Sequence, residues 1–267
     1  MSVRSRIVAT TIFALTSSCA LAQDDAQELA KKLSNPIASL ISVPLQLNYD
    51  DNIGPGERGD KWQLNVQPVI PISLSKDWNL ISRTIVPLIN QKDVSAPGER
   101  NSGIGDVVQS LFFSPVKPTA GGWIWGAGPV LLLRTGEDNL SGEKWGGGPT
   151  AVVLKQDSGW TYGALANHIW SFAGSDSARD ISATFVQPFV SFTTKSATTY
   201  GLNTEATYDW KSDKWSVPIN ATVSQLIRVG KQPLSIGGGV RYWASTPDNV
   251  GPKGWGFRVF ITALFPK

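Results

Sequence analysis

Hydrophobic and polar residues alternate along most of this chain with a period of two, which is the period of a β-strand. In residues 214–228, for example, Trp215, Val217 and Ile219 occupy every second position, and mostly polar residues lie between them. Residues 254–265 have the same pattern. Each such segment predicts a strand with one apolar face and one polar face.

The alternation falls into about twelve segments, which are separated by residues that favour turns. The predicted strands cover residues 41–50, 61–74, 78–91, 104–115, 122–134, 145–155, 159–172, 181–194, 199–210, 214–228, 234–244 and 254–265. Connections after odd-numbered strands tend to be long, as at 134–144, and those after even-numbered strands tend to be short, as at 156–158. Long loops on one side and short turns on the other are typical of outer-membrane barrels, and an even strand number leaves both chain ends in the periplasm.

The aromatic residues distinguish a membrane barrel from a soluble sandwich. Tryptophan and tyrosine lie mainly at the ends of predicted strands, whereas aliphatic residues and alanine fill the strand centres. Two aromatic belts around an aliphatic band are typical of a protein that crosses a bilayer with strands. After the first 22 residues, no apolar run is long enough for a membrane helix. The sequence therefore predicts an all-β, antiparallel transmembrane β-barrel of about twelve strands.

Several prolines fall inside the predicted strands, where they remove donors from the sheet. They are Pro68, Pro71, Pro87, Pro129, Pro149, Pro188 and Pro218. A closed barrel has no edge strand to tolerate them, so we expect each proline to lie at a bulge or an unpaired position. We also expect the two strand faces to exchange at these points, and the pattern in 181–194 does not decide which face is which.

The N-terminus has the pattern of a cleaved signal peptide. Two early arginines precede the apolar stretch Ile7–Leu15, and Ala20–Ala22 forms an A-x-A cleavage site. The apolar stretch is too short to be a membrane helix. Cys19 would also allow a lipoprotein signal, but Thr16–Ser18 lacks the aliphatic residue that such a signal needs. We therefore favour ordinary cleavage before Gln23.

A short helix is predicted at the start of the mature chain. Ala26, Leu29, Ala30 and Leu33 lie on one helical face, and Asn35-Pro36 ends the helix. This helix is either a periplasmic lead-in or a plug in the barrel mouth. The predicted chain has three parts: a signal peptide at 1–22, an N-terminal periplasmic or plug helix at 23–40, and a transmembrane β-barrel at 41–267.

Composition excludes several kinds of site. The formal net charge is +3, and loss of Arg4 and Arg6 with the signal leaves 3 − 2 = +1, so nucleic acid is not an expected partner. Cleavage also removes the single cysteine and leaves one histidine, which is too few ligands for a typical metal site. No metal and no cofactor are expected. The glycine triplets Gly146–Gly148 and Gly237–Gly239 are not phosphate loops, since neither a lysine-serine pair nor a helix follows them, so we expect close strand approach there.

The single histidine does not predict an active site. His168 shares a strand face with Trp160 and Trp170, whereas Ser171 and Asn167 point to the opposite face. A serine nucleophile needs an adjacent base that a third group orients. We therefore expect that the protein is not an enzyme and that His168 has an interfacial or structural role.

Charged residues on the polar strand faces are the candidate functional residues. The lumen and selectivity candidates are Arg83, Asp106, Arg134, Glu205, Asp209, Arg228, Arg241 and Arg258. On the lipid side each would cost about 2–4 kcal/mol at the bilayer midplane, so they should face the lumen. They form either an ion-pair network that fills a narrow interior or a constriction that selects solutes. Arginine outnumbers acid among them, which favours anionic or polarisable solutes.

The direction of each strand sets the expected heights of these side chains. Arg241 and Arg258 should form a basic pair near the outer mouth, while Arg228 should lie near the periplasmic side. Asp209 is expected to approach the upper pair. We expect this upper cluster to control solute access and to make any conductance prefer anions.

Short motifs along nearly the whole mature chain match a known family. They are Asn35–Ile41, Ser102–Asp106, Trp170–Gly174, Gln187–Phe189, Tyr208–Trp210 and Leu264–Lys267. With these motifs the chain resembles the transporter-like outer-membrane β-barrel proteins that are grouped under the meta-pathway of phenol degradation. The resemblance implies a barrel of passive transport type and includes the prolines within strands. It implies no particular solute.

The expected function is a passive channel or transporter for small organic solutes, aromatic or anionic, in the outer membrane of a Gram-negative cell. The alternative is a structural or loop-presenting barrel without an open pore, closed by side chains and by the Asp25–Ser34 helix. The expected partners are outer-membrane lipid, a small-molecule solute and, during biogenesis, the barrel assembly machinery.

Overall fold

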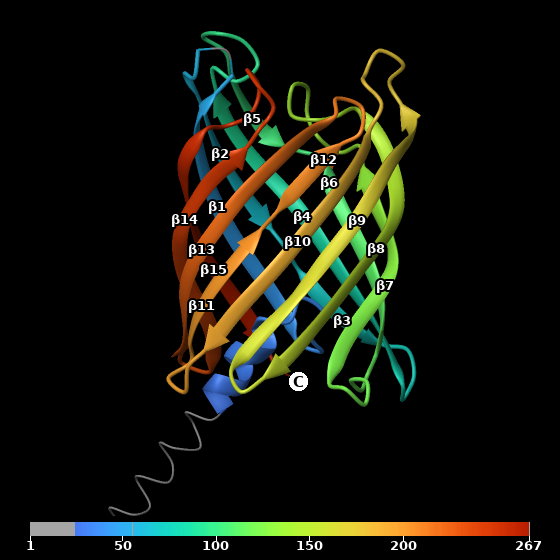
Figure 1. Cartoon of the computed structure of the whole chain (residues 1–267), viewed down its shortest axis with the longest axis vertical. Helices are drawn as coiled ribbons and strands as arrows, with labels where there is room; N and C mark the ends of the chain where they lie inside the picture. The colour runs from blue at the N-terminus through green and yellow to red at the C-terminus, as the bar shows by residue number, and fades with distance from the viewer. Residues whose placement is uncertain (1–24, 55, 267) are drawn as a thin grey trace, which may run out of the picture.

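The computed structural model describes residues 25–54 and 56–266, so the predicted signal peptide at 1–22 lies outside the described residues. A helix at 25–33 precedes a single antiparallel sheet (Figure 1). Its strands are β1 (Ile41–Ile53), β2 (Gly59–Val66), β3 (Val69–Ser73), β4 (Trp78–Lys92), β5 (Arg100–Ile104), β6 (Val107–Pro115), β7 (Trp123–Leu133), β8 (Lys144–Asp157), β9 (Trp160–Gly174), β10 (Ser182–Thr193), β11 (Thr198–Thr204), β12 (Ala206–Asp209), β13 (Lys214–Val229), β14 (Gln232–Ser245) and β15 (Gly254–Phe265).

The sheet closes on itself because the last strand pairs with the first. β15 runs antiparallel to β1, with Ile41 opposite Phe265, and each strand between them pairs with its neighbours. β2 and β3, β5 and β6, and β11 and β12 are the halves of three interrupted strands, so the fifteen elements make twelve spanning strands. The predicted antiparallel barrel of about twelve strands is confirmed.

The prolines disturb the sheet less than the sequence predicted. Pro218 lies at a register shift between β13 and β14, as expected for a bulge. Pro68 separates β2 from β3, but both halves keep the same register with β4, so the strand faces do not exchange there. Pro188 lies within continuous register. Pro87 is in continuous register with β2, but the strand on its other side has a bulge at Gly105–Asp106, as expected. Within the proline-containing strands the predicted exchange of faces at these three prolines is therefore wrong, because a missing N–H affects only the one neighbour to which it would point.

The outer surface of the barrel is apolar. Ten of the eleven tryptophans are exposed on it, and contacting rings form clusters such as Tyr49–Trp62–Phe257 near the outer rim and Trp78–Trp125 near the periplasmic rim. Aliphatic side chains are exposed between them, including Val223 and Ile261. This arrangement is the apolar band with two aromatic girdles that a bilayer requires.

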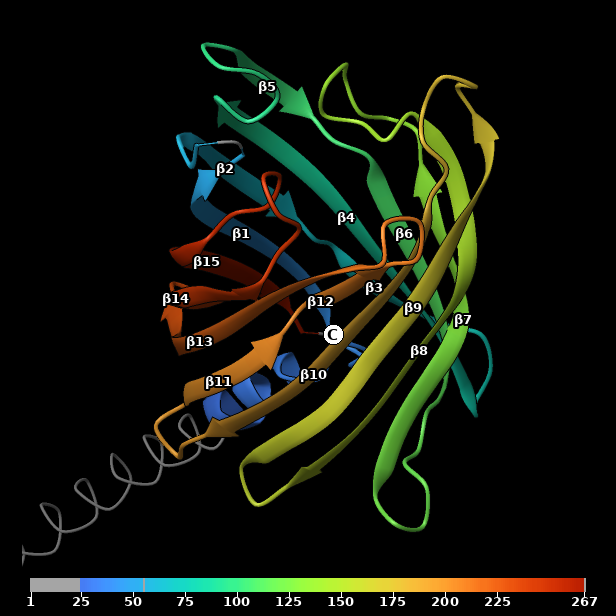
Figure 2. The same ribbon diagram turned by 45° about the horizontal axis from the view of Figure 1, so that its top comes forward.

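The N-terminal helix lies at the end of the barrel that carries the short turns (Figures 1 and 2). Ala30 is buried against Leu226 of β13 and Leu264 of β15, whose side chains point into the barrel. The side-chain amide of Gln156 donates to the carbonyl of Lys31 at 2.7 Å. The helix therefore lies in the periplasmic mouth. In the described part of the chain, no helix is long and apolar enough to cross a membrane.

Two neighbouring residues at the middle of β13 face lipid and lumen respectively, so the same substitution should lower stability by different amounts at the two positions. Val223 is exposed on the outer face, so Val223→Arg should lower the free energy of unfolding in lipid vesicles by about 2–4 kcal/mol. Thr222 lines a cavity inside the barrel, so Thr222→Arg should cost much less. Equal costs, measured by urea unfolding, would contradict the assignment of the two faces.

The glycine triplets allow close strand approach, as predicted. A Cβ atom on Gly148 would meet the carbonyl oxygen of His168 at 1.9 Å, whereas one on Gly147 would have ordinary contacts from 3.4 Å. Gly148→Ala should therefore lower the unfolding free energy by about 1–3 kcal/mol through overpacking. The matched Gly147→Ala variant should be close to wild type. Unfolding midpoints measured from gel mobility will show whether the two positions differ in this way.

Candidate functional site

The buried apolar cluster and most of the buried charges lie on opposite walls of the lumen, called here the apolar wall and the polar wall, although buried hydroxyl groups such as those of Thr150 and Thr161 also lie on the first. The apolar wall, on strands β3–β10, is built from a buried cluster that also includes Ile37 of the N-terminal segment. Its other buried members are Val69, Ile81, Phe112, Val152, Leu154 and Leu165. The opposite wall, on β11–β15, β1 and β2, has buried polar or charged side chains, among them Asn48, Asp50, Asn220, Arg241 and Arg258. The buried apolar cluster therefore faces a group of buried charges across the barrel interior.

Arg258 and Glu205 form the central ion pair of the polar wall. The Arg258 guanidinium donates to both Glu205 carboxylate oxygens, at 2.9 and 2.8 Å, and its Nε donates to Asn48 Oδ1 at 2.7 Å. Arg258 is 3% exposed. A buried arginine is stable when its donors are satisfied in this way, with two parallel bonds to one carboxylate.

Two prolines explain why the strand is interrupted at Glu205. The register of β11 and β12 with β13 places Glu205 opposite Pro218, and their register with β10 places Thr204 opposite Pro188. Neither proline has an N–H to donate. The ladder is therefore broken between β11 and β12, at the residue whose carboxylate binds Arg258.

Arg241 belongs to a second cluster on the same wall. Its Nε lies 3.5 Å from Asp50 Oδ1, and its guanidinium carbon lies 4.6 Å from the centre of the Trp243 ring. The Trp243 indole N–H donates to the same Asp50 oxygen at 2.7 Å. Arg241 and Arg258 are on adjacent strands, with Arg241 opposite Gly256, so they are close neighbours as predicted. Each, however, has a carboxylate partner.

Arg83 projects from β4 into the same lumen. Its Nη2 donates to Gln67 Oε1 at 3.1 Å. Among the described residues, no carboxylate lies within 4.0 Å of its guanidinium. Of the three inward-facing arginines, Arg83 is thus the one without an ion-pair partner.

Four predicted candidates lie at the rims, away from this central cluster. Arg134 is exposed in an outer loop, 3.9 Å from Glu143, and Arg228 is exposed near the periplasmic end of β13. Asp209 pairs with Arg179 at 2.9 Å and accepts from Lys211 N and Ser212 Oγ. The expectation that Asp209 approaches the basic pair is therefore wrong, because the carboxylate organises its own turn instead.

Asp106, the fourth rim residue, anchors the loop 134–143. The registers of β5 and β6 with β4 differ by one, so a bulge lies at Gly105–Asp106. A bulge redirects a side chain, and here the Asp106 carboxylate accepts from Gly136 N, Ser141 Oγ and Gly142 N. Asp106 therefore shapes the outer mouth rather than the lumen wall.

Ion pairs also order the remaining outer loops. Lys253 lies 2.8 Å from Glu57 of the first loop, and this hydrogen bond and charge raise the pKa of the Lys253 ammonium. Lys144 lies 3.0 Å from Asp180, and the bond to Lys144 holds the pKa of the Asp180 carboxyl below its usual range. All these groups are outside the lipid-facing band, and they link neighbouring loops around the mouth.

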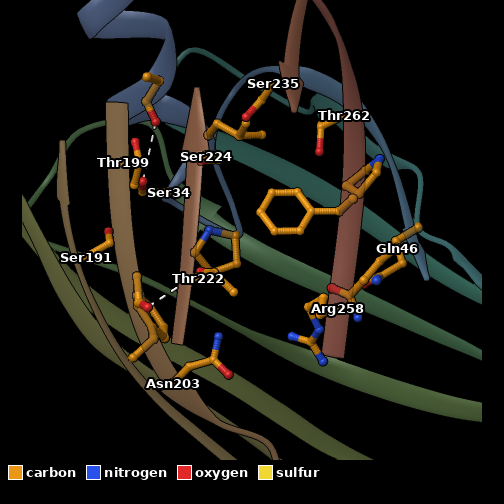
Figure 3. Close-up of a pocket in the computed structure, with 18 of the residues that line it drawn as sticks. Ser34, Gln46, Ser191, Thr199, Asn203, Thr222, Ser224, Ser235, Arg258 and Thr262 are labelled. Atoms are coloured by element: carbon orange, nitrogen blue, oxygen red, sulfur yellow. Dashed lines mark hydrogen bonds between the residues drawn. The ribbon is translucent and has the colours of Figure 1, made fainter. Parts of the chain in front are cut away.

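A chamber of about 280 Å³ lies between the N-terminal helix and the polar wall (Figure 3). Arg258 and Asn203 lie at one end of it, and Ser34 of the N-terminal segment lies at the other. Hydroxyl groups surround its middle, from Ser191, Thr199, Thr222, Ser224, Ser235 and Thr262. The chamber is the candidate site for a small organic molecule, because it is a concave cavity with a few converging polar groups.

His168 lies on the outer face, as predicted, but its neighbours were not all foreseen. Its Nδ1 is 2.7 Å from Thr184 Oγ1, and the nearest serine is Ser182 of the adjacent strand, with Oγ 3.5 Å from Nε2. Thr184 Oγ1 also accepts from the Trp210 indole at 2.8 Å. Because a neutral hydroxyl replaces the carboxylate that usually orients a catalytic histidine, this is a hydrogen-bonded anchor in the aromatic girdle. The described residues contain no group of three or more possible metal ligands.

Sequence reasoning missed Asn48, Asp50 and Trp243. The first two were detectable, because they alternate with Leu47 and Tyr49 and so lie on the polar face of the first strand, with Ser42 and Gln46. Trp243 was hidden among the girdle tryptophans, and only its position two residues from Arg241 indicates that it faces inward.

Comparisons with known proteins agree with this architecture. The family model described as "Putative MetA-pathway of phenol degradation" matches residues 64–251. No curated protein matches the sequence. Among solved structures, the COG4313 outer membrane channel from Pseudomonas putida F1 is similar over 85% of this chain and 96% of that chain, with 14% identity and a TM-score of 0.66.

Looser structural matches include outer membrane phospholipase A from Escherichia coli and the KdgM porin. The first covers 84% of this chain and 90% of that chain at 9% identity, with a TM-score of 0.49. The second covers 84% and 99% at 12% identity, with a TM-score of 0.46. At such identities the likeness is one of fold. The barrel, with its apolar band and aromatic girdles, is located in the outer membrane of a Gram-negative cell.

The Glu205–Arg258 pair predicts a specific pattern of stability. Glu205→Gln should lower the free energy of unfolding by about 3–5 kcal/mol, because it leaves the Arg258 charge buried without a carboxylate. The double variant Glu205→Gln/Arg258→Gln should be more stable than the single one. As a control, Asp209→Asn in the exposed rim pair should cost less than about 1 kcal/mol. A Glu205→Gln variant as stable as Asp209→Asn would show that the central pair is not needed.

Proposed function

This chain belongs to the family of the MetA-pathway of phenol degradation, and on that basis we propose that it is a passive channel for small organic solutes, with preference for anionic or aromatic ones. The observation that carries the proposal is the lumen with unlike walls. Once the N-terminal segment with Ile37 leaves the cluster, a solute with an apolar body and one polar group can contact the cluster with its carbon skeleton and the charges of the opposite wall with its polar group. An aqueous pore lined by charge on all sides would favour ions and sugars instead.

The lumen charges support an anion preference. Glu205 is within electrostatic range of Arg258, Arg241 and Arg83, and Arg241 also pairs with Asp50, so arginine outnumbers acid in this group. The potential there is expected to be positive, which attracts anions and repels cations. Loop 134–143, held by Asp106, would then determine which solutes reach this region from outside.

The N-terminal helix is the proposed gate on the periplasmic side. It contacts lumen-facing side chains through a small apolar face made of Ala26, Leu29, Ala30 and Leu33, while Glu28 and Lys32 face solvent. A helix held by so few apolar contacts can leave and return without unfolding the barrel. Lipid and the barrel assembly machinery remain the proposed partners in the membrane, and we propose no enzymatic activity.

The same helix also favours the second candidate, a structural or loop-presenting barrel without an open pore. If the helix and the apolar cluster around Ile37 stay in place permanently, solutes cannot pass. The two candidates differ in whether the periplasmic mouth opens.

Conductance in planar bilayers should separate the two candidates. Deletion of residues 25–38 should produce steady open channels, because it removes from the described barrel both the helix in the periplasmic mouth and Ile37, which packs in the apolar cluster. Ala30→Arg should also raise the open fraction, since Ala30 is 5% exposed and packs against Leu226 and Leu264. Lys32→Gln, on the solvent face, should behave as wild type. If neither helix variant gives conductance although a gel confirms that the protein is present in the membrane, the second candidate, a barrel without an open pore, is correct.

A further inference from the structure

The central lumen has more positive than negative side chains. Among the described residues, Asp50 and Glu205 act there on the positive groups Lys61, Arg83, Arg241 and Arg258. Four positive and two negative groups leave a surplus of 4 − 2 = +2. Charges enclosed by protein are costly unless they are paired, so this surplus favours a bound anion.

The hydrogen bonds show which cation is available to a ligand. Arg258 uses Nε for Asn48 and both terminal nitrogens for Glu205, so its donors are already satisfied. Arg241 forms an ion pair with Asp50 at 3.5 Å and lies against the Trp243 ring; although its Nε has no hydrogen-bond partner among the described residues, neither Arg241 nor Lys61 lines the chamber. Arg83 has a bond to Gln67 and no carboxylate within 4.0 Å among the described residues. Its remaining donors are therefore free for an oxyanion, and a guanidinium matches the two oxygens of a carboxylate.

Arg83 opens onto the chamber above the helix. Arg83, Gln67, Gln46, Asn203 and Arg258 all line it. The Ser191 hydroxyl, also in the lining, is buried and has no hydrogen-bond partner among the described residues. A bound molecule would satisfy this group, whose burial is otherwise unfavourable.

The rest of the chamber is suited to hydrocarbon. Phe189 and Phe260 line it, together with Leu226 and, from the N-terminal segment, Leu33 and Pro36. A Cβ atom on Gly237 would lie 2.5 Å from Phe260 Cζ, so the absence of a side chain at Gly237 makes room for this ring on the neighbouring strand. A volume of about 280 Å³ exceeds the roughly 150 Å³ that suffices for benzene in a protein cavity.

We propose that this chamber is a binding site for a small organic monoanion, in which Arg83 and Gln67 bind the carboxylate and the Phe189–Phe260 side contacts a compact apolar body. Arg83 provides one unpaired cation, which selects a single negative charge. The apolar lining disfavours inorganic ions, which have no apolar surface to bury against it. The assignment rests on the proposed channel function for the route by which the ligand arrives, but binding itself is measurable without conductance.

Calorimetric titration of benzoate into the full mature protein in lipid nanodiscs tests this site. One saturable site is expected, and Arg83→Gln should weaken it about tenfold or more, because a charge-assisted pair is lost. Arg83→Lys should retain part of the affinity. Lys231→Gln, in the exposed β13–β14 turn, should bind as wild type. Benzyl alcohol, which has the ring without the charge, should not compete.

Three results would overturn the assignment. They are the absence of saturable benzoate binding, equal affinity in wild type and Arg83→Gln, and equal competition by phosphate or chloride, which would indicate a general anion site. If Arg83→Gln fails to fold by the gel-mobility test, Ser191→Phe provides the second variant, because it fills the chamber without removing a charge and should abolish binding. Wild-type channels that conduct while benzoate does not bind would refute the site and leave the proposed function intact.

Discussion

In a bilayer, each backbone N–H and C=O must find its partner within the protein, and this constraint determines the rest of the structure. The twelve-stranded sheet meets it by pairing β15 with β1, which leaves no edge. Where proline cannot contribute a donor, the sheet gives way locally. The interruption at Glu205, between Pro188 and Pro218, is such a place, and the central charge of the lumen lies there. The backbone pairing of the closed sheet and the position of the Glu205 carboxylate in the lumen are thus linked.

Much of the barrel was predictable from sequence because its determinants are local. Trp255, Val259 and Ile261 face lipid since every second residue of a strand must, and turn-forming residues mark the strand ends to within a few positions. The effect of proline was overestimated. Pro129 shows that one missing donor is tolerated without a shift of register with either neighbour, which the alternation alone does not reveal.

The candidate site was harder to predict because its contacts join distant parts of the chain. Arg258 was recognised as a lumen residue from its strand, but its partners Asn48 and Glu205 are 210 and 53 residues away. Which acid it meets depends on barrel register and on the interruption beside Pro218, so Asp209 was assigned to the wrong arginine. Local alternation gives the facing of a side chain, and only the closed barrel gives its partner.

The position of the N-terminal helix has a consequence for the order of assembly. The helix is the first described element of the chain, yet it docks on Leu226 and Leu264, which belong to the last strands to be synthesised. Its binding surface therefore does not exist until β13 and β15 are in the wall. An unfinished barrel therefore cannot hold the helix in its periplasmic mouth. The helix can dock only after β15 has paired with β1, so a docked helix indicates a completed barrel.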